Sequence, residues 1–246
     1  MRIYINPLRH DISIKKNDEG LQIIIQTERL SIRSIELKDE KACFDLFGDP
    51  DVMKKYADGL PYTEDKKKSR FEMWTRRWKD HDPYSAYMVF EKESGNSVGI
   101  IGIGHAARGE SELFYATSSH CWGKGYGTEM VEAVVQSLIP RLMMRGYKPG
   151  HGSLKKLEAD VDMDNPASHR ILLKVGFQQT GLVYRFGAWR QSYSIFSKQL
   201  RNEYHHFFDN KDRAARREAY LRSVDEGVDV TVAEMAASSF GRFYRK

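Results

Sequence analysis

Cysteine is nearly absent from this sequence, which has two, Cys43 and Cys121, in 246 residues. Two cysteines exclude the disulfide framework of a small secreted domain, and no histidine pair stands beside them at the spacing of zinc ligands. We therefore expect a reducing, cytoplasmic setting and no metal. Long apolar runs are also missing. None approaches the roughly 20 residues of a membrane helix, and the first seven residues lack the apolar core of a signal peptide.

Charges of the two signs nearly balance, with 39 lysines and arginines, 34 acidic residues and a net charge of +5. This excess is mild and diffuse, so it suits an anionic cofactor or a weakly acidic partner but does not argue for nucleic acid. Apolar residues make up 41% of the chain and charged residues 30%, which favours a packed core over disorder. The length suits one large domain with extensions.

A glycine-rich stretch organises the sequence. Gly123, Gly125 and Gly127 alternate between a strand-like run, residues 113–117, and the start of an apolar helical pattern. The first N–H groups of a helix have no partner in the helix, and its dipole adds positive potential there. Glycine also lets a ligand approach the backbone closely. The stretch therefore predicts a phosphate or pyrophosphate site, although its spacing is neither the dinucleotide fingerprint nor a P-loop.

Alternating and helical patterns predict that the chain contains both strands and helices. The alternating or apolar runs that predict strands are residues 2–5, 21–26, 27–33, 84–91, 98–104, 112–117, 157–161, 177–185 and 191–196. Helical spacing predicts helices at residues 40–47 with Asp39 as N-cap, 63–79, 128–142, and 167–175 ending at Gly176. Residues 146–153 read as a loop insertion, and residues 209–224 and 230–240 as helices of a C-terminal extension.

Three aromatic residues, Phe71, Trp74 and Trp78, share one face of the second predicted helix. Core packing is the favoured use of this face. Lining a substrate cleft is the alternative, because two tryptophans are unusual on an ordinary amphipathic helix.

Two motifs in this order resemble the GNAT (GCN5-related N-acetyltransferase) superfamily over roughly residues 27–200. The first is Trp122-Gly123-Lys124-Gly125-Tyr126 after a strand. The second is Asn165-x-x-Ser168, followed by Lys174-x-Gly176-Phe177. Trp122 stands where the superfamily usually has arginine or glutamine. Tryptophan is common there in the branch that acetylates ribosomal-protein alanine and serine N-termini, which the chain resembles most.

The resemblance implies an α+β fold with a mixed, mostly antiparallel central sheet. The sheet would be splayed between its fourth and fifth core strands and have helices on both faces. We expect an N-terminal β extension at residues 1–26, an acetyltransferase domain at 27–200 and a helical C-terminal extension at 201–246.

The activity implied is direct transfer of an acetyl group from acetyl-CoA to a primary amine, in the first place a protein N-terminus. The loop N–H groups would hold the CoA pyrophosphate, and the strand before the loop would pair with the pantetheine arm. Lys124 and Lys174 would add charge near the phosphates unless they are simply solvated. The implied cofactor residues are Tyr115, Ala116, Thr117, Trp122, Gly123, Lys124, Gly125, Tyr126, Gly127, Thr128, Asn165 and Lys174.

Three catalytic residues are implied. Ser168 matches the position that meets the departing sulfur, and Asn165 the position that bonds the cofactor or a water; either could instead only cap the helix. Glu112 is the candidate general base, provided that it does not face solvent. Glu158 and Asp160 on the partner strand compete for this role. Cys121 is expected to be structural, because direct transfer needs no covalent acyl-enzyme.

Two alternatives remain open. The acceptor could be a small amine such as a polyamine, an amino acid or an antibiotic, although a polycation predicts an acidic cleft and the sequence is basic around residues 66–79. The chain could also be a non-catalytic acyl-CoA-binding module. A membrane or nucleic-acid partner is not expected, and the patterns leave monomer and homodimer equally open.

Overall fold

The computed structural model describes residues 10–150 and 152–200. The predicted strand at residues 2–5 and the predicted C-terminal extension lie outside them. Within the described residues nine strands form one sheet, in the order β1-β2-β3-β4-β5-β6-β7-β9-β8. The strands are β1 (Asp11–Asn17), β2 (Gly20–Gln26), β3 (Leu30–Ser34), β4 (Ala86–Glu91), β5 (Ser97–His105), β6 (Glu110–Thr117), β7 (Lys156–Asp162), β8 (Gln178–Arg185) and β9 (Ala188–Phe196).

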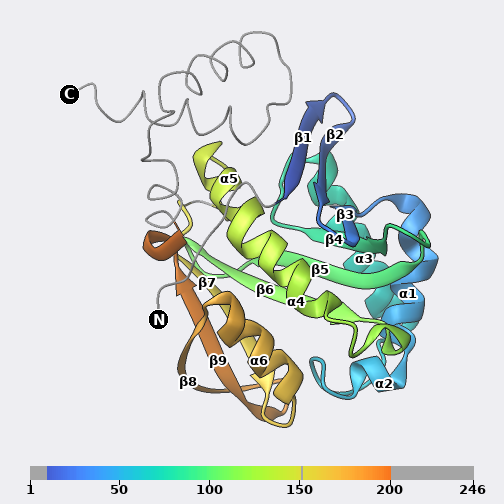
Figure 1. The fold of residues 1–246 in the computed structure, drawn as a ribbon, viewed down its shortest axis with the longest axis vertical. Coiled ribbons are helices and arrows are strands. Elements are labelled where there is room, and N and C mark those ends of the chain that lie inside the picture. Colours follow the sequence, from blue (N-terminus) through green and yellow to red (C-terminus); the bar gives the residue numbers. More distant parts are fainter. Residues whose placement is uncertain (1–9, 151, 201–246) are drawn as a thin grey trace.

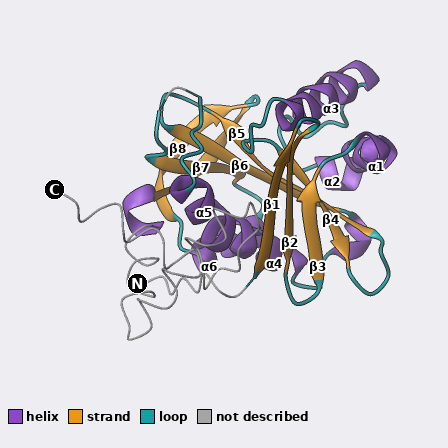
Figure 2. Cartoon of the chain, turned by 90° about the horizontal axis from the view of Figure 1, so that it is seen from above, coloured by secondary structure: helices purple, strands orange, loops and turns teal. Residues whose placement is uncertain are grey.

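Helices cover both faces of this sheet. One face carries α1 (Glu40–Gly48), α2 (Pro50–Met53) and α3 (Glu64–Lys79), and the other carries α4 (Tyr126–Glu132), α5 (Ile139–Met144) and α6 (Pro166–Val175) (Figures 1 and 2). All neighbouring strands are antiparallel except β6 and β7, which are parallel. The predicted α+β fold with a mixed, mostly antiparallel sheet is confirmed.

The N-terminal hairpin contains a strand that the sequence patterns did not predict, β1, which pairs with β2. Lysines interrupt the apolar pattern of β1, but Ile12 and Ile14 are buried. The turn between β1 and β2 is closed by the Asn17 side chain, which accepts hydrogen bonds from the N–H groups of Glu19 and Gly20, both at 3.1 Å. Through β2 this hairpin extends the sheet beyond β3.

β3 begins later than predicted, whereas α1 begins at Glu40 as predicted but without the expected cap bond. Thr27 does not enter the strand, because it closes a turn by accepting from the Leu30 N–H at 2.8 Å. Asp39 stands at the N-cap position of α1 but makes no side-chain cap bond. Its carboxylate instead takes two hydrogen bonds of 2.7 Å from Arg33 and one of 2.7 Å from the Glu36 N–H. An ion pair therefore replaces the predicted cap.

The predicted helix at residues 128–142 is one continuous run from α4 to α5, with a π-helical segment, η3 (Ala133–Leu138), between them. Pro140 is the second residue after this segment. Proline has no N–H to donate, and its ring would clash with the carbonyl four residues earlier in a regular helix. The wider π turn is therefore placed where the helix has to accommodate the proline.

The aromatic face of α3 packs in the core, as predicted. Phe71, Trp74 and Trp78 are all buried, and the Trp74 ring stacks on Phe114 of β6 with centroids 5.5 Å apart. The Phe114 ring in turn lies over Gly102 of β5, where an added Cβ would stand only 2.1 Å from it. Because Gly102 has no side chain, the Phe114 ring fits against the sheet and can stack on Trp74 of α3.

We expect Gly102→Ala to lower the free energy of unfolding by about 1–3 kcal/mol, because the new methyl group overlaps the Phe114 ring. Gly104→Ala on the same strand is the matched control, since its Cβ would meet nothing nearer than 3.8 Å. Urea denaturation measures both. In a double-mutant cycle, Phe114→Leu should relieve part of the Gly102→Ala loss. Strict additivity of the two changes would contradict this packing account.

Candidate active site

The parallel pair β6 and β7 separates soon after it begins. The pairing joins Glu110 to Lys156, Ser111 to Leu157 and Glu112 to Glu158, and then ends. β6 nevertheless continues to Thr117 and β7 to Asp162, each still paired with its other neighbour. The two strands therefore diverge after Glu112 and leave a gap in the middle of the sheet (Figure 1). Their facing backbone edges in this gap are free to bond a ligand.

The glycine loop stands at the end of β6, directly before α4. Gly123 and Gly125 adopt φ of +75° and +82°, the left-handed region that favours glycine. The N–H groups of Gly123, Lys124 and Gly125 donate to no partner within the described part of the chain. Gly125 is the N-cap of α4 and has no side chain to satisfy the first turn. The loop thus presents a run of unused donors at a positive helix end.

A clamp fixes this loop to the start of β3. Glu129 of α4 accepts from the Thr27 hydroxyl at 2.6 Å and from the Arg29 N–H and Nε at 2.9 and 2.8 Å. Arg29 also donates to the Lys124 carbonyl at 2.8 Å, and its guanidinium lies 4.7 Å from the Tyr126 ring centroid. Although burial opposes it, these hydrogen bonds hold the pKa of Glu129 below its ordinary value. The loop conformation therefore depends on an ionised Glu129.

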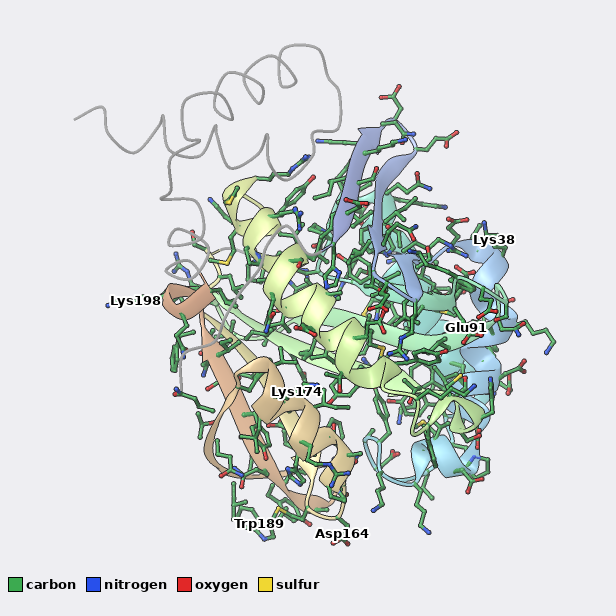
Figure 3. The ribbon with its side chains drawn as sticks, in the orientation of Figure 1. Lys38, Glu91, Asp164, Lys174, Trp189 and Lys198 are labelled. Carbon is green, nitrogen blue, oxygen red and sulfur yellow. The ribbon has the colours of Figure 1, made fainter. Side chains whose placement is uncertain are left out.

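Residues around the loop have different environments. The Tyr126 hydroxyl bonds to Glu91 at the end of β4 (Figure 3). Trp122 is 53% exposed, and its indole N–H donates to the Thr117 carbonyl at 3.0 Å. Lys174 is exposed on α6 (Figure 3) and Cys121 is buried. An exposed tryptophan anchored at the end of β6 is well placed to contact a ligand on the loop.

A cleft of about 210 Å³ opens where β6 and β7 separate. Residues of six elements and three loops line it, and the polar and aromatic ones are Lys55, Tyr56, Tyr62, Arg70, Trp74, Glu112, Phe114, Tyr115, Asp160, Asp162, Asn165, Ser168, Arg185, Phe186 and Arg190. Both uses weighed for Trp74 are realised, because it packs in the core and also forms part of this wall.

The cleft crosses the sheet from one face to the other. Side chains alternate along a strand, so Phe114 of β6 points to α3, where it stacks on Trp74, and Tyr115 points to α6. Glu112 shares the parity of Phe114 and so lies on the α3 side. The glycine loop begins α4, on the opposite side (Figure 2). One ligand can therefore approach from each face and meet the other in the gap.

Ser168 lies at the start of α6, within the cleft. The Asn165 side chain accepts from the Ser168 N–H at 3.1 Å, so the predicted capping is present. The Ser168 hydroxyl is 2.5 Å from the Tyr115 hydroxyl across the gap. Burial is the main cause that raises the pKa of Tyr115, which keeps its phenol protonated. Sequence reasoning placed Tyr115 in the cofactor strand but did not foresee this side-chain pair.

Of the three candidate carboxylates, Glu112 and Asp160 line the cleft, whereas Glu158 pairs with Lys156 at 2.7 Å. Arg185 joins the first two. It donates to Asp160 at 2.6 Å and to the two Glu112 oxygens at 3.1 and 3.4 Å. Asp160 also accepts from the Ser192 hydroxyl at 2.5 Å. Arg185 is a cleft residue that sequence reasoning missed, since it comes from the end of β8, far along the chain.

The described residues offer neither a cluster of metal ligands nor a membrane-spanning helix. Their His, Cys, Asp and Glu side chains form no group of three or more that could hold a metal ion. No helix among residues 10–150 and 152–200 has the length and apolar character needed to span a membrane.

Comparisons with known proteins agree with this geometry. The model of a family described as the acetyltransferase (GNAT) domain matches residues 29–178. The chain is 25% identical over 161 residues to an uncharacterized N-acetyltransferase, p20, of Bacillus licheniformis, covering 65% of this chain and 84% of that protein.

Two solved structures are similar in fold. One is a spermidine N-acetyltransferase from Vibrio cholerae in complex with CoA and spermine, with 16% identity and a TM-score of 0.56 over 72% of this chain and 100% of that chain. The other is RimL, a ribosomal L7/L12 alpha-N-protein acetyltransferase in complex with CoA. Its identity is 14% and its TM-score 0.56, over 70% of this chain and 97% of that chain.

We expect Glu129→Gln to lower the melting temperature at neutral pH, because it removes the charge that holds Arg29 and the loop. The folded-state pKa of Glu129 lies below its ordinary 4.5, so its stabilisation is present above pH 4.5 and is lost as the pH falls through the lowered value. The difference in melting temperature between the native protein and Glu129→Gln should therefore disappear in acid. Glu93→Gln, in the exposed β4–β5 turn, is the control and should show no gap. A pH-independent gap for Glu129→Gln would refute the clamp.

Proposed function

Because the chain belongs to the acetyltransferase (GNAT) family, in which acetyl-CoA is the donor, we propose that it acetylates the N-terminal amine of a protein by direct transfer. The observation that carries the proposal is the cleft through the sheet, with the Ser168–Tyr115 hydroxyl pair on one side and Glu112 on the other. Direct transfer needs an amine without its proton, a polarised thioester and a proton for the departing sulfur. Each role has a candidate side chain.

The loop and the gap fit the donor. Acetyl-CoA supplies the thioester. The unused N–H groups of Gly123, Lys124 and Gly125 offer hydrogen bonds to a pyrophosphate, and glycine keeps this surface free of side chains, since a Cβ at Gly123 would meet nothing within 4 Å. The free edge of β6 after Glu112 offers backbone hydrogen bonds to the amide-bearing pantetheine arm, as in strand addition. Trp122, Lys124, Asn165 and Lys174 remain proposed cofactor contacts.

Ser168 is proposed to give its proton to the departing sulfur. A serine hydroxyl is a weak acid, but here it is 2.5 Å from a second hydroxyl, that of Tyr115, which lies in a buried setting. As the C–S bond breaks, Ser168 passes its proton to the sulfur while Tyr115 passes its own to the serine oxygen, and the tyrosine then regains a proton from water. Asn165 holds this arrangement by capping the turn that carries Ser168.

Glu112 is proposed to take the proton of the amine, through water. It lines the cleft, and its side chain is 33% exposed. Arg185 approaches Asp160 more closely, at 2.6 Å, than it approaches Glu112, at 3.1 and 3.4 Å. Asp160 therefore takes the larger share of the arginine, and Glu112 keeps lone pairs for an incoming amine. Asp160 acts in this account as the residue that holds Arg185.

The charges of the cleft favour an N-terminus over a polyamine, although the similar solved structures include enzymes named for each kind of acceptor. The cleft has three carboxylates, and each pairs with a cleft arginine: Glu112 and Asp160 with Arg185, and Asp162 with Arg190 at 3.6 Å. Lys55 and Arg70 add further positive charge. Only Glu112, the carboxylate held less closely by Arg185, is open to an amine, so the cleft offers no second carboxylate to a polycation.

Ser168→Ala should lower kcat by about a hundredfold or more, because it removes the proton donor. Tyr115→Phe keeps the ring and should cost about tenfold, since Ser168 remains. The dissociation constant of CoA should stay within about twofold in both, because neither side chain contacts the loop. Thiol release from acetyl-CoA with a serine-led peptide measures the rates. Tyr184→Phe, on exposed β8, is the control. Full activity in Ser168→Ala would remove it from the mechanism.

Glu112→Gln should lower kcat/KM by about a hundredfold, because the amine proton loses its acceptor. The measurement is kcat/KM on the same peptide. A variant that keeps the native kcat/KM would exclude Glu112 as the base. Tight CoA binding without turnover of any peptide or small amine would instead favour the non-catalytic module.

A further inference from the structure

Three side chains on the α3 side of the cleft have donors without a hydrogen-bond partner among the described residues. Arg70 of α3 makes no hydrogen bond or ion pair with any residue between 10 and 150 or between 152 and 200. The hydroxyls of Tyr56 and Tyr62 likewise bond to no side chain or backbone group in these ranges. All three residues line the same cleft, and Arg70 is exposed at its mouth, where a ligand can reach it.

Packing fixes the two tyrosine rings. Phe47 of α1 is buried and stacks on Tyr62, with centroids 5.2 Å apart and planes 11° from parallel. It also contacts Tyr56 at 5.6 Å, and the two tyrosines meet edge to face at 6.4 Å. The Tyr62 N–H further donates to the Phe47 carbonyl at 2.9 Å. The hydroxyls are therefore held in place before any ligand arrives.

The neighbouring charges leave Arg70 as the available cation of this wall. Lys66 lies 3.9 Å from the Tyr62 centroid but pairs with Asp58 at 3.2 Å. Lys55, also in the cleft, donates to the Asp164 carbonyl. Burial is the leading cause that raises the pKa of both Tyr56 and Tyr62, so both remain protonated donors at neutral pH, and the Arg70 charge acts on both. One guanidinium and two phenols make a site for an anion.

We propose that Arg70, Tyr56 and Tyr62 bind a carboxylate that the acceptor carries close to its reactive amine. A guanidinium matches the two oxygens of a carboxylate with parallel N–H donors. The proposed base lies in the same cleft, since Glu112 lines it together with Arg70, Tyr56 and Tyr62. An acceptor can thus place its amine at Glu112 and its carboxylate at Arg70. This inference rests on the proposed function and narrows its substrate class.

Two kinds of acceptor present this chemistry. One is a protein N-terminus with an acidic residue next to the first, and the other is a free amino acid with its own α-carboxylate. Besides Arg70, α3 carries six lysines and arginines, which suits an acidic peptide that extends beyond the site.

The test compares acceptors that differ only in the carboxylate. The pairs are a Ser-Asp-led and a Ser-Asn-led peptide, and free serine and serinamide, with spermidine as the polycation. We expect the native enzyme to prefer the carboxylate member by roughly tenfold to a hundredfold in kcat/KM, mainly through KM. Arg70→Gln should lose this preference yet keep its rate with the Ser-Asn peptide and its affinity for CoA. Arg76→Gln, exposed on the same helix outside the cleft, is the matched control.

A double variant, Tyr56→Phe with Tyr62→Phe, keeps both rings and should reduce the preference by several-fold. Equal kcat/KM for the two members of each pair in the native enzyme would overturn the carboxylate site while leaving the peptide activity intact. An equal loss of kcat/KM for both acceptors of a pair in Arg70→Gln would also overturn the carboxylate site. A preference confined to free serine would uphold the site and contradict the protein acceptor.

A binding measurement tests the carboxylate site if the protein turns over no acceptor. If no acceptor is turned over, calorimetry with CoA present compares the native protein and Arg70→Gln for N-acetyl-Ser-Asp peptide. Binding that is lost in Arg70→Gln would uphold the site and reject the proposed activity, and equal binding by the two proteins would reject the site.

Discussion

The early end of the pairing between β6 and β7 is the constraint on which the rest of the site depends. Three residue pairs hold the two strands together, and Glu112 is the last of them on β6. Beyond it the sheet has a gap that no other strand of residues 10–150 and 152–200 fills. The free backbone edges, the cleft and the approach from both faces all follow from this divergence. The glycine loop ends β6, and the turn into α6 follows β7, so one strand leads to the donor loop and the other to Ser168.

Each half of the cleft is supported by residues that take no part in chemistry. On the donor side, Glu129 and Arg29 hold a loop whose glycines adopt left-handed φ and whose N–H groups are left unused. On the acceptor side, Phe47 fixes two tyrosines and Trp74 fixes Phe114, over a glycine that has no room for a side chain. Rigid neighbours of this kind keep unsatisfied polar groups in position, which a flexible loop could not do.

Much of the fold could be predicted from local pattern. The long helices and most strands have strong periodicity, and the glycine spacing marked the loop. β1 was not predicted because its exposed side is lysine-rich. The π-helical segment was not predicted because it depends on a single proline inside an apolar helix. The predictions also placed Asn165, Ser168 and Glu112 in one site. The partners of these residues were not predictable, because Tyr115 and Ser168 stand 53 positions apart and Glu112 and Arg185 stand 73 apart. Only the folded sheet shows which distant charges and hydroxyls meet.

The central claim is that the donor sulfur and the acceptor amine meet in the gap between β6 and β7. A crystal structure with a bisubstrate analogue, in which CoA is joined through its sulfur to an acidic peptide, tests it most directly. The account predicts the sulfur within hydrogen-bonding reach of the Ser168 hydroxyl, the pyrophosphate on the glycine loop, and the peptide leaving past Glu112 on the α3 side. A sulfur far from Ser168, or a peptide that leaves on the α4 side, would contradict it.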